Sequence, residues 1–127
     1  MVPGRYDVEL EREVRDWLET LTIIEYAKVE AMADILADNA ETLGEPYSRH
    51  LFGKTRELRF HLGRSAVRIS YWVAPRARVV LPTVFRKTRQ VERAEVARAV
   101  LAQEACESGH EAHAPADVIY ERKWGSG

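Results

Sequence analysis

The chain has 127 residues, of which 46% are hydrophobic and 31% charged, and its formal net charge at pH 7 is −1. These values predict one soluble globular domain, and the absence of a long apolar run or a signal-peptide pattern predicts a cytoplasmic protein without a membrane span. The single cysteine excludes an internal disulfide. The charges are nevertheless segregated, because residues 47–90 carry 11 basic side chains and one acidic one, whereas residues 1–46 carry 12 acidic and 4 basic.

The first part of the chain predicts a short strand followed by two helices. Residues 6–10 alternate between apolar and polar, as in a half-buried strand, and residues 11–20 repeat apolar side chains at helical spacing. Thr22 and Glu25 form a capping-box pattern that begins the second helix, and Gly44 is expected to end it. The expected apolar stripe of that helix consists of Ile24, Ala27, Ala31, Ile35 and Leu36.

The middle of the chain predicts three antiparallel strands with short turns. Residues 57–62 alternate between polar and apolar side chains, and residues 63–65 are typical of a turn. In the strand that follows, Val67, Ile69, Tyr71 and Val73 are expected to face inward. His50 is interpreted as part of the loop that leads into the sheet. The third strand, residues 78–85, contains Pro82, which cannot donate to a ladder and therefore predicts an edge position or a bulge.

The last part predicts a helix over residues 91–107, with Gly109 ending it. Its apolar positions are Val96, Ala97, Val100 and Leu101. The expected class is α+β: a strand, two antiparallel helices, a three-stranded antiparallel meander, and a C-terminal helix packed on one sheet face, with the other face open. We expect residues 1–110 to form the domain and residues 111–127 to form a tail.

The strand alternation gathers cationic side chains on the open face. If Leu58 and its apolar neighbours pack against the helices, the side chains that project outward are Arg59, His61, Arg68, Ser70 and Trp72. Arg86 and Lys87 follow at the rim of the same face. Guanidinium groups bind phosphate bidentately, and Trp72 has the flat surface on which a nucleobase stacks. We therefore predict a face that binds a polyanion; the alternative is solvated charge that pairs with acids from the helices.

The same groups suit cleavage of RNA. That reaction needs positive charge on the phosphorane-like transition state and groups that transfer protons to and from oxygen. Arginines meet the first need, and His61 meets the second because an imidazole can both accept and donate a proton. His110 and His113 are spaced as a possible metal pair, but no third ligand accompanies them. We predict chemistry that requires no metal and no cofactor.

Three motifs in order carry a family resemblance: residues 54–60 with their E-L-R sequence, Val67-Arg68-Ile69-Ser70-Tyr71-Trp72, and Phe85-Arg86-Lys87-Thr88-Arg89. Together they resemble the RelE/ParE toxin superfamily, above all its phage-derived, HigB-like branch. The resemblance implies the toxin of a type II toxin–antitoxin system: an mRNA interferase (endoribonuclease) that cleaves translated mRNA at the ribosome. It also implies a separate antitoxin partner with a helix-turn-helix domain.

The resemblance also implies roles for individual residues. Arg59 and His61 would form the proton-transfer and phosphate-contact pair, while Arg68 and Lys87 would stabilise charge on the phosphate. RNA-binding roles fall to Lys54, Arg56, Trp72, Arg86 and Arg89.

Some features depart from the family pattern, and two other functions stay open. Some relatives use a tyrosine in or near the last helix as a catalytic group, but residues 91–109 supply none. ParE-type members lack the catalytic set and inhibit DNA gyrase instead, so resemblance in fold leaves the target open. A third possibility is an interaction module whose basic sheet binds an acidic partner.

Overall fold

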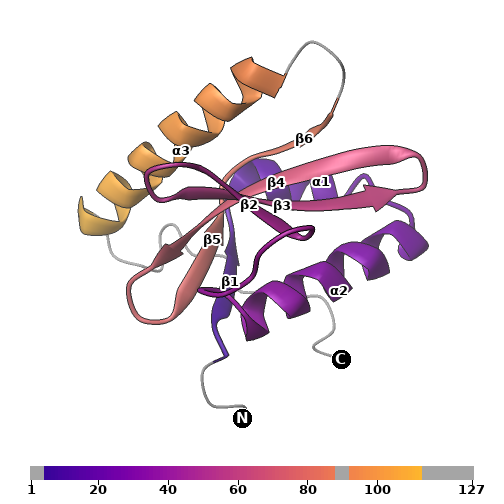
Figure 1. Cartoon of the computed structure of the whole chain (residues 1–127), viewed down its shortest axis with the longest axis horizontal. Coiled ribbons are helices and arrows are strands. Elements are labelled where there is room, and N and C mark those ends of the chain that lie inside the picture. The colour runs from indigo at the N-terminus through magenta and orange to yellow at the C-terminus, as the bar shows by residue number, and fades with distance from the viewer. Residues whose placement is uncertain (1–4, 88–91, 113–127) are drawn as a thin grey trace.

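The computed structural model describes residues 5–87 and 92–112, which form six strands and three helices. The strands belong to one sheet in the order β1-β5-β4-β3-β2, with β6 paired to β4 outside this path. In chain order (Figure 1) the elements are β1 (Asp7–Leu10), α1 (Arg12–Leu18), α2 (Ile23–Asp38), β2 (Ser48–Phe52), β3 (Thr55–Leu62), β4 (Ser65–Ala74), β5 (Arg78–Leu81), β6 (Val84–Arg86) and α3 (Glu92–Ala112).

The predicted α+β class is confirmed, and the sheet is larger than the predicted meander. β1 pairs with β5 in parallel, and the other pairs are antiparallel. His50, interpreted from sequence as part of a loop, lies in the edge strand β2, for which no strand was predicted. The sequence of β2 has no apolar alternation because four of the five side chains face solvent or lie half-buried. β2 is a strand because it pairs with β3, and the pattern of its own side chains does not indicate a strand.

The predicted third strand is divided at Pro82. β5 pairs with the C-terminal half of β4, and β6 pairs with its N-terminal half. The prediction of an edge position is wrong, since β5 lies between β1 and β4; the predicted irregularity is present. Ser70 closes the break by donating its N–H to the Thr83 carbonyl (2.9 Å) and accepting the Thr83 N–H on Oγ (3.0 Å).

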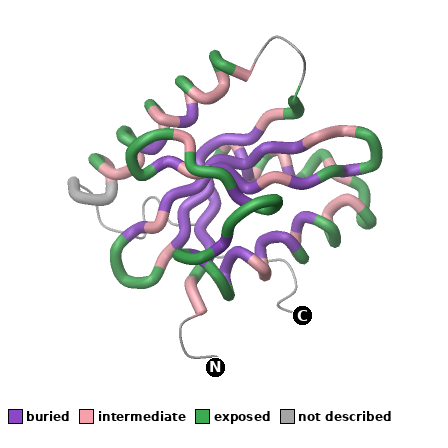
Figure 2. Tube along the Cα trace, viewed as in Figure 1, coloured by how far each residue is buried: buried purple, intermediate pink, exposed green. Residues whose placement is uncertain are grey.

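Helices cover both faces of the sheet, which corrects the expected open face. α1 and α2 pack with Leu58, Ile69 and Tyr71 in the main core. On the other face Trp72, Ala74 and Val80 form a second cluster against Cys106 of α3. Figure 1 shows α2 and α3 on opposite sides of the strands, and Figure 2 shows the buried strands between them. The uncovered part of the second face is therefore limited to the region around the β3–β4 hairpin.

The buried side of α2 differs from the predicted stripe. Ile23 and Ile24 are 88% and 83% exposed, and Ala27 and Ala31 also face solvent. An alanine-rich helix offers more than one apolar stripe, and the one that meets the sheet consists of Val29, Met32, Ala33, Leu36 and Ala37. The helix ends at Asp38, before Gly44, because Asn39 caps it: its N–H donates to the Leu36 carbonyl and its Nδ2 to that of Ile35.

α3 presents much of its predicted apolar stripe to solvent. Ala97 and Leu101 are exposed, whereas Ala99 and Gln103 are buried against the sheet. The helix continues past Gly109 to Ala112. The stripe borders an apolar groove of about 790 Å³, whose walls include Leu51, Phe52, Val96, Ala97, Val100 and Leu101. Of the predicted tail, residues 111–127, the first two belong to α3, and residues 113–127 lie outside the described residues.

The capping box at the start of α2 gives the first testable prediction. The Glu25 N–H donates to Thr22 Oγ1 (3.1 Å), and the Thr22 N–H donates to Glu25 Oε1 (3.0 Å). Thr22→Ala removes the side-chain acceptor and is expected to lower the free energy of unfolding by about 1 kcal/mol. Urea denaturation measures this, with the exposed Thr42→Ala as a control expected to change stability by less than about 0.5 kcal/mol. Equal effects of the two substitutions would show that the cap contributes nothing.

Candidate functional site: a cationic sheet face

The strand register brings the four predicted catalytic residues onto one face. Arg59 of β3 lies directly opposite Arg68 of β4, and His61 lies opposite Ala66. The Lys87 N–H donates to the Ala66 carbonyl (2.7 Å), which continues the same row beyond β6. Side chains opposite one another in a ladder share a face. Arg59, His61, Arg68 and Lys87 therefore belong to one face, called here the cationic face.

Arg49 adds a cation that the sequence analysis did not assign. It lies opposite Glu57 in the β2–β3 ladder, one row from Arg59 and Arg68, and its side chain is exposed. Its position depends on β2, for which no strand was predicted. The surplus of basic residues over residues 47–90 was the available signal, but only pairing between β2 and β3 fixes the direction of this side chain.

Glu57 lies between the two central arginines. Its side chain is 2% exposed, and its Oε2 is 3.6 Å from Arg59 Nε and 3.8 Å from Arg68 Nε. These distances are too long for hydrogen bonds. Within the part of the chain that the structure describes, both Nε atoms and Glu57 Oε1 are buried without a hydrogen-bond partner. The carboxylate thus balances charge without engaging the arginines in a bidentate pair.

Burial dominates the electrostatics of this group. It raises the pKa of Glu57, although Arg68 and Arg59 oppose the shift. Burial also lowers the pKa of Arg68, and the neighbouring charge of Arg59 lowers it further. Two guanidinium groups held together at one carboxylate leave a positive excess, which an added phosphate would relieve.

Among the described residues, no carboxylate of α1 or α2 forms an ion pair with Arg59, Arg68 or Lys87. Arg59 Nη1 lies 3.8 Å from Glu45 Oε1 in the loop before β2, and Lys87 Nζ lies 3.9 Å from Glu92 Oε1 of α3. Glu45 is 77% exposed in its side chain. Neutralisation by the N-terminal helices, the alternative drawn from sequence, therefore does not account for the cationic face.

The residues predicted only to bind RNA are dispersed. Trp72 is 1% exposed beneath α3 and cannot stack on a base. Arg56 lies opposite Tyr71 on the other face, where it donates to the Tyr71 hydroxyl and the Leu43 carbonyl. Lys54 forms an ion pair with Glu107 of α3. Arg86 lies opposite Val67 and so belongs to the sheet face that packs against α1 and α2. Arg89 is outside the described residues.

Arg98 of α3 fixes the strand that leads to Lys87. Its Nη2 donates to the Val84 carbonyl of β6 (3.3 Å), and its Nε donates to Glu95 Oε1 (2.9 Å). The Val84 N–H donates to Glu13 Oε2 of α1 (2.8 Å), and Glu13 also binds Arg98. These carboxylates raise the pKa of Arg98. β6 is thereby held between α1 and α3, which places Lys87 at the end of a fixed strand.

The lone cysteine is part of the packing between α3 and the sheet. The Cys106 thiol donates to Glu11 Oε1 (2.9 Å) and packs against the Trp72 cluster. Burial and the neighbouring carboxylate raise the pKa of Cys106 far above its ordinary value, so the reactive thiolate is disfavoured. Among the described residues no three His, Cys, Asp or Glu side chains are grouped as metal ligands, and no helix is long and apolar enough to cross a membrane.

A cavity of about 430 Å³ opens beside the cationic face. It lies where β3 extends beyond its pairing with β2, between the loop that enters β2 and α2. Arg59, His61 and Arg68 line it from the sheet, and Lys28 adds a cation from α2. The remaining lining residues are Met32, Pro46, Tyr47 and Phe60.

Comparison with known proteins agrees with this fold. A family model described as phage derived protein Gp49-like matches residues 16–106. The fold is similar to a mutant form of the E. coli toxin RelE in the free state, with a TM-score of 0.55 and 13% sequence identity over 78% of this chain and 97% of that one. A search of curated protein sequences found no match. The RelE-like resemblance drawn from residues 54–89 is thus confirmed for the fold, and the match to the Gp49-like model confirms a phage-derived family.

Proposed function

The chain belongs to the Gp49-like family of phage-derived proteins, and we propose that it is the toxin of a type II toxin–antitoxin pair that cleaves mRNA. The observation that carries this proposal is the position of Arg59 opposite Arg68 on the sheet face that α3 covers only in part, where both line a cavity with His61 and lie near Lys87. A RelE-like fold alone does not choose between targets. The chemistry of this face favours a phosphodiester.

Each residue has a role that its position supports. Arg68 and Arg59 stabilise the charge that develops on the phosphate in the transition state, since both lie in the same row of the sheet. His61 is exposed, so its imidazole can reach the attacking or leaving oxygen and transfer a proton. Lys87 contacts a phosphate oxygen from the end of β6, and Arg49 guides the RNA backbone at the other side of the face.

The partners follow from the same proposal. We infer that the substrate is translated mRNA at the ribosome, and that a separate antitoxin with a helix-turn-helix domain holds the toxin inactive. Induced expression should arrest growth, and co-expression of the gene next to it should restore growth. Primer extension on transcripts should then reveal new 5′ ends within coding regions. Intact transcripts, combined with loss of gyrase supercoiling activity in vitro, would instead identify a gyrase inhibitor.

Lys87 offers a test in which fold and function separate. Its side chain is 39% exposed and its ion pair with Glu92 is long, so Lys87→Ala is expected to change the free energy of unfolding by less than about 0.5 kcal/mol. Loss of a phosphate contact is expected to reduce RNA cleavage by roughly tenfold to a hundredfold. Arg64→Ala, in the exposed β3–β4 turn, is the matched control and should cleave normally. Equal cleavage rates for both variants would remove Lys87 from the site.

A further inference from the structure

The cavity beside the cationic face has two chemically different walls. Arg59, His61 and Arg68 present polar and cationic groups, whereas Met32, Phe60 and Tyr47 present apolar and aromatic surface. Lys28 of α2 adds a further cation at the rim of the cavity. A ligand that fits both must carry an anion at one end and a flat apolar group at the other. The volume of about 430 Å³ lies within the range of small-molecule sites and suits one nucleotide.

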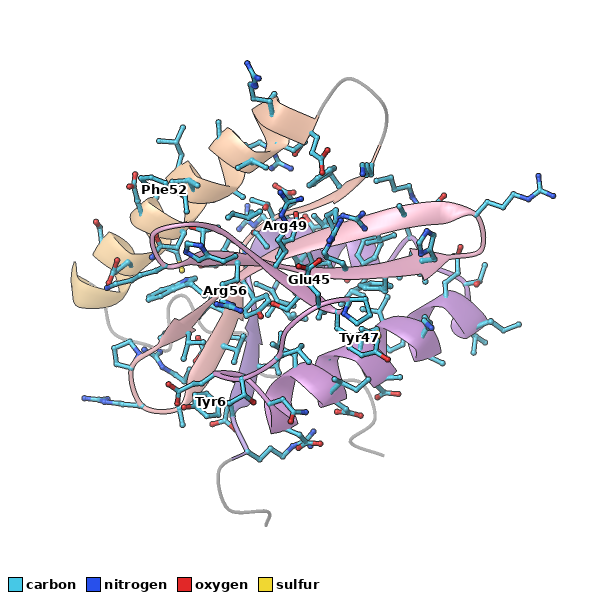
Figure 3. The ribbon with its side chains drawn as sticks, in the orientation of Figure 1. Tyr6, Glu45, Tyr47, Arg49, Phe52 and Arg56 are labelled. Carbon is cyan, nitrogen blue, oxygen red and sulfur yellow. The ribbon has the colours of Figure 1, made fainter. Side chains whose placement is uncertain are left out.

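Tyr47 is the exposed aromatic residue of this cavity. It is 45% exposed, although it sits in a segment whose backbone is fixed. Its carbonyl accepts the Arg59 N–H (2.8 Å), and its own N–H donates to the Gly44 carbonyl (3.1 Å). Figure 3 shows the ring beside α2, on the loop that enters β2. An aromatic ring held by its backbone next to an arginine pair is suited to stacking on a base whose phosphate lies at those arginines.

We propose that this cavity binds the nucleobase adjoining the scissile phosphate, with Tyr47 as the stacking surface. The inference rests on the proposed RNA cleavage and extends it by placing the base as well as the phosphate. It also reassigns the stacking role predicted for Trp72, which is buried. Tyr47 comes from the loop before β2, far in sequence from the last helix, where residues 92–109 supply no tyrosine. Stacking is tolerant of base identity, so all four bases should be accepted.

The experiment compares nucleotides with phosphate alone. Inorganic phosphate and the four nucleoside 3′-monophosphates are titrated into the protein, and binding is followed by NMR chemical shifts. We expect nucleotides to bind roughly tenfold more tightly than phosphate, because stacking adds to the anion contact. Tyr47→Ala should remove that gain and leave phosphate affinity unchanged, whereas Tyr47→Phe should retain it.

Phe52 provides the matched control. It is 64% exposed at the other end of β2 and lines the groove against α3, away from the cationic face (Figure 3). Phe52→Ala should therefore bind nucleotides as the wild type does. If nucleotides bind no more tightly than phosphate, or if Tyr47→Ala keeps the full gain, the base-binding inference is wrong while the phosphate site stands. If neither phosphate nor nucleotide binds, the proposed function fails with it.

Discussion

Replacing Arg68 with alanine is expected to abolish RNA cleavage and also to weaken the fold at neutral pH. Loss of a group that stabilises transition-state charge typically lowers the rate by about 10²–10³-fold. Arg68 is only 6% exposed and compensates the buried Glu57, so its removal leaves that carboxylate with fewer opposing charges. Removal of one partner from a buried ion pair costs about 3 kcal/mol in stability. An inactive Arg68→Ala protein therefore has two possible causes, which must be separated.

The pH dependence of stability separates them. Burial already raises the pKa of Glu57, and loss of Arg68 should raise it further. A carboxyl whose pKa is higher in the folded state contributes stability below its unfolded pKa, and that contribution is lost as the pH rises through the folded pKa. The deficit of Arg68→Ala relative to wild type should therefore shrink as the pH is lowered from 7 toward about 4.3, the ordinary pKa of glutamate. Urea midpoints at several pH values measure this.

A second substitution completes the design. In the Arg68→Ala background, Glu57→Gln removes the uncompensated charge and should restore stability at pH 7, but it cannot restore positive charge at the phosphate. Recovery of the fold without recovery of cleavage supports a direct role for Arg68. Recovery of cleavage in the double variant would show that Arg68 acts only by neutralising Glu57. A single variant as stable as wild type at pH 7 would contradict the ion-pair account.

The cationic face could be predicted because it depends on local pattern. Period-two alternation on either side of the turn at Gly63 fixes which side chains of β3 and β4 share a face, and Gly63 has the positive φ of 58° that this turn requires. The pairing of Arg59 with Arg68 follows directly. Lys87 could be placed for a similar reason, since β6 continues the aliphatic strand after the break at Pro82.

The surroundings of the cationic face could not be predicted because they depend on contacts between distant segments. β2 has no alternation of its own, so Arg49 and Tyr47 had no assigned direction until pairing with β3 was known. The apolar residues of α3 occupy more than one side of the helix, and sequence alone did not show which side meets the sheet. The sequence therefore predicted an open face, whereas α3 covers part of that face. For the same reason Trp72 was predicted to bind RNA, whereas it belongs to the second core cluster.

Trp72→Ala gives the sharpest comparison between those two assignments. The structure places Trp72 at 1% exposure, packed with Ala74, Val80 and Cys106, so truncation should open a large cavity and cost about 4 kcal/mol of stability. That is a large share of the 5–15 kcal/mol that holds a typical domain together. Circular dichroism during urea unfolding measures it, with the exposed Tyr47→Ala as a control that should unfold near the wild-type midpoint.

RNA affinity also distinguishes a core role of Trp72 from an RNA-stacking role, because a core role predicts little change in affinity. Below its unfolding transition, folded Trp72→Ala should bind RNA almost as well as wild type, because the indole lies beneath α3 and away from the cavity that contains Tyr47. If Trp72→Ala were instead as stable as wild type but no longer bound RNA, Trp72 would have to stack on the RNA. In that case α3 would have to move away from the sheet when RNA binds. The expected result, lost stability with retained affinity, instead makes α3 a fixed cover that confines RNA to the region between Arg49 and His61.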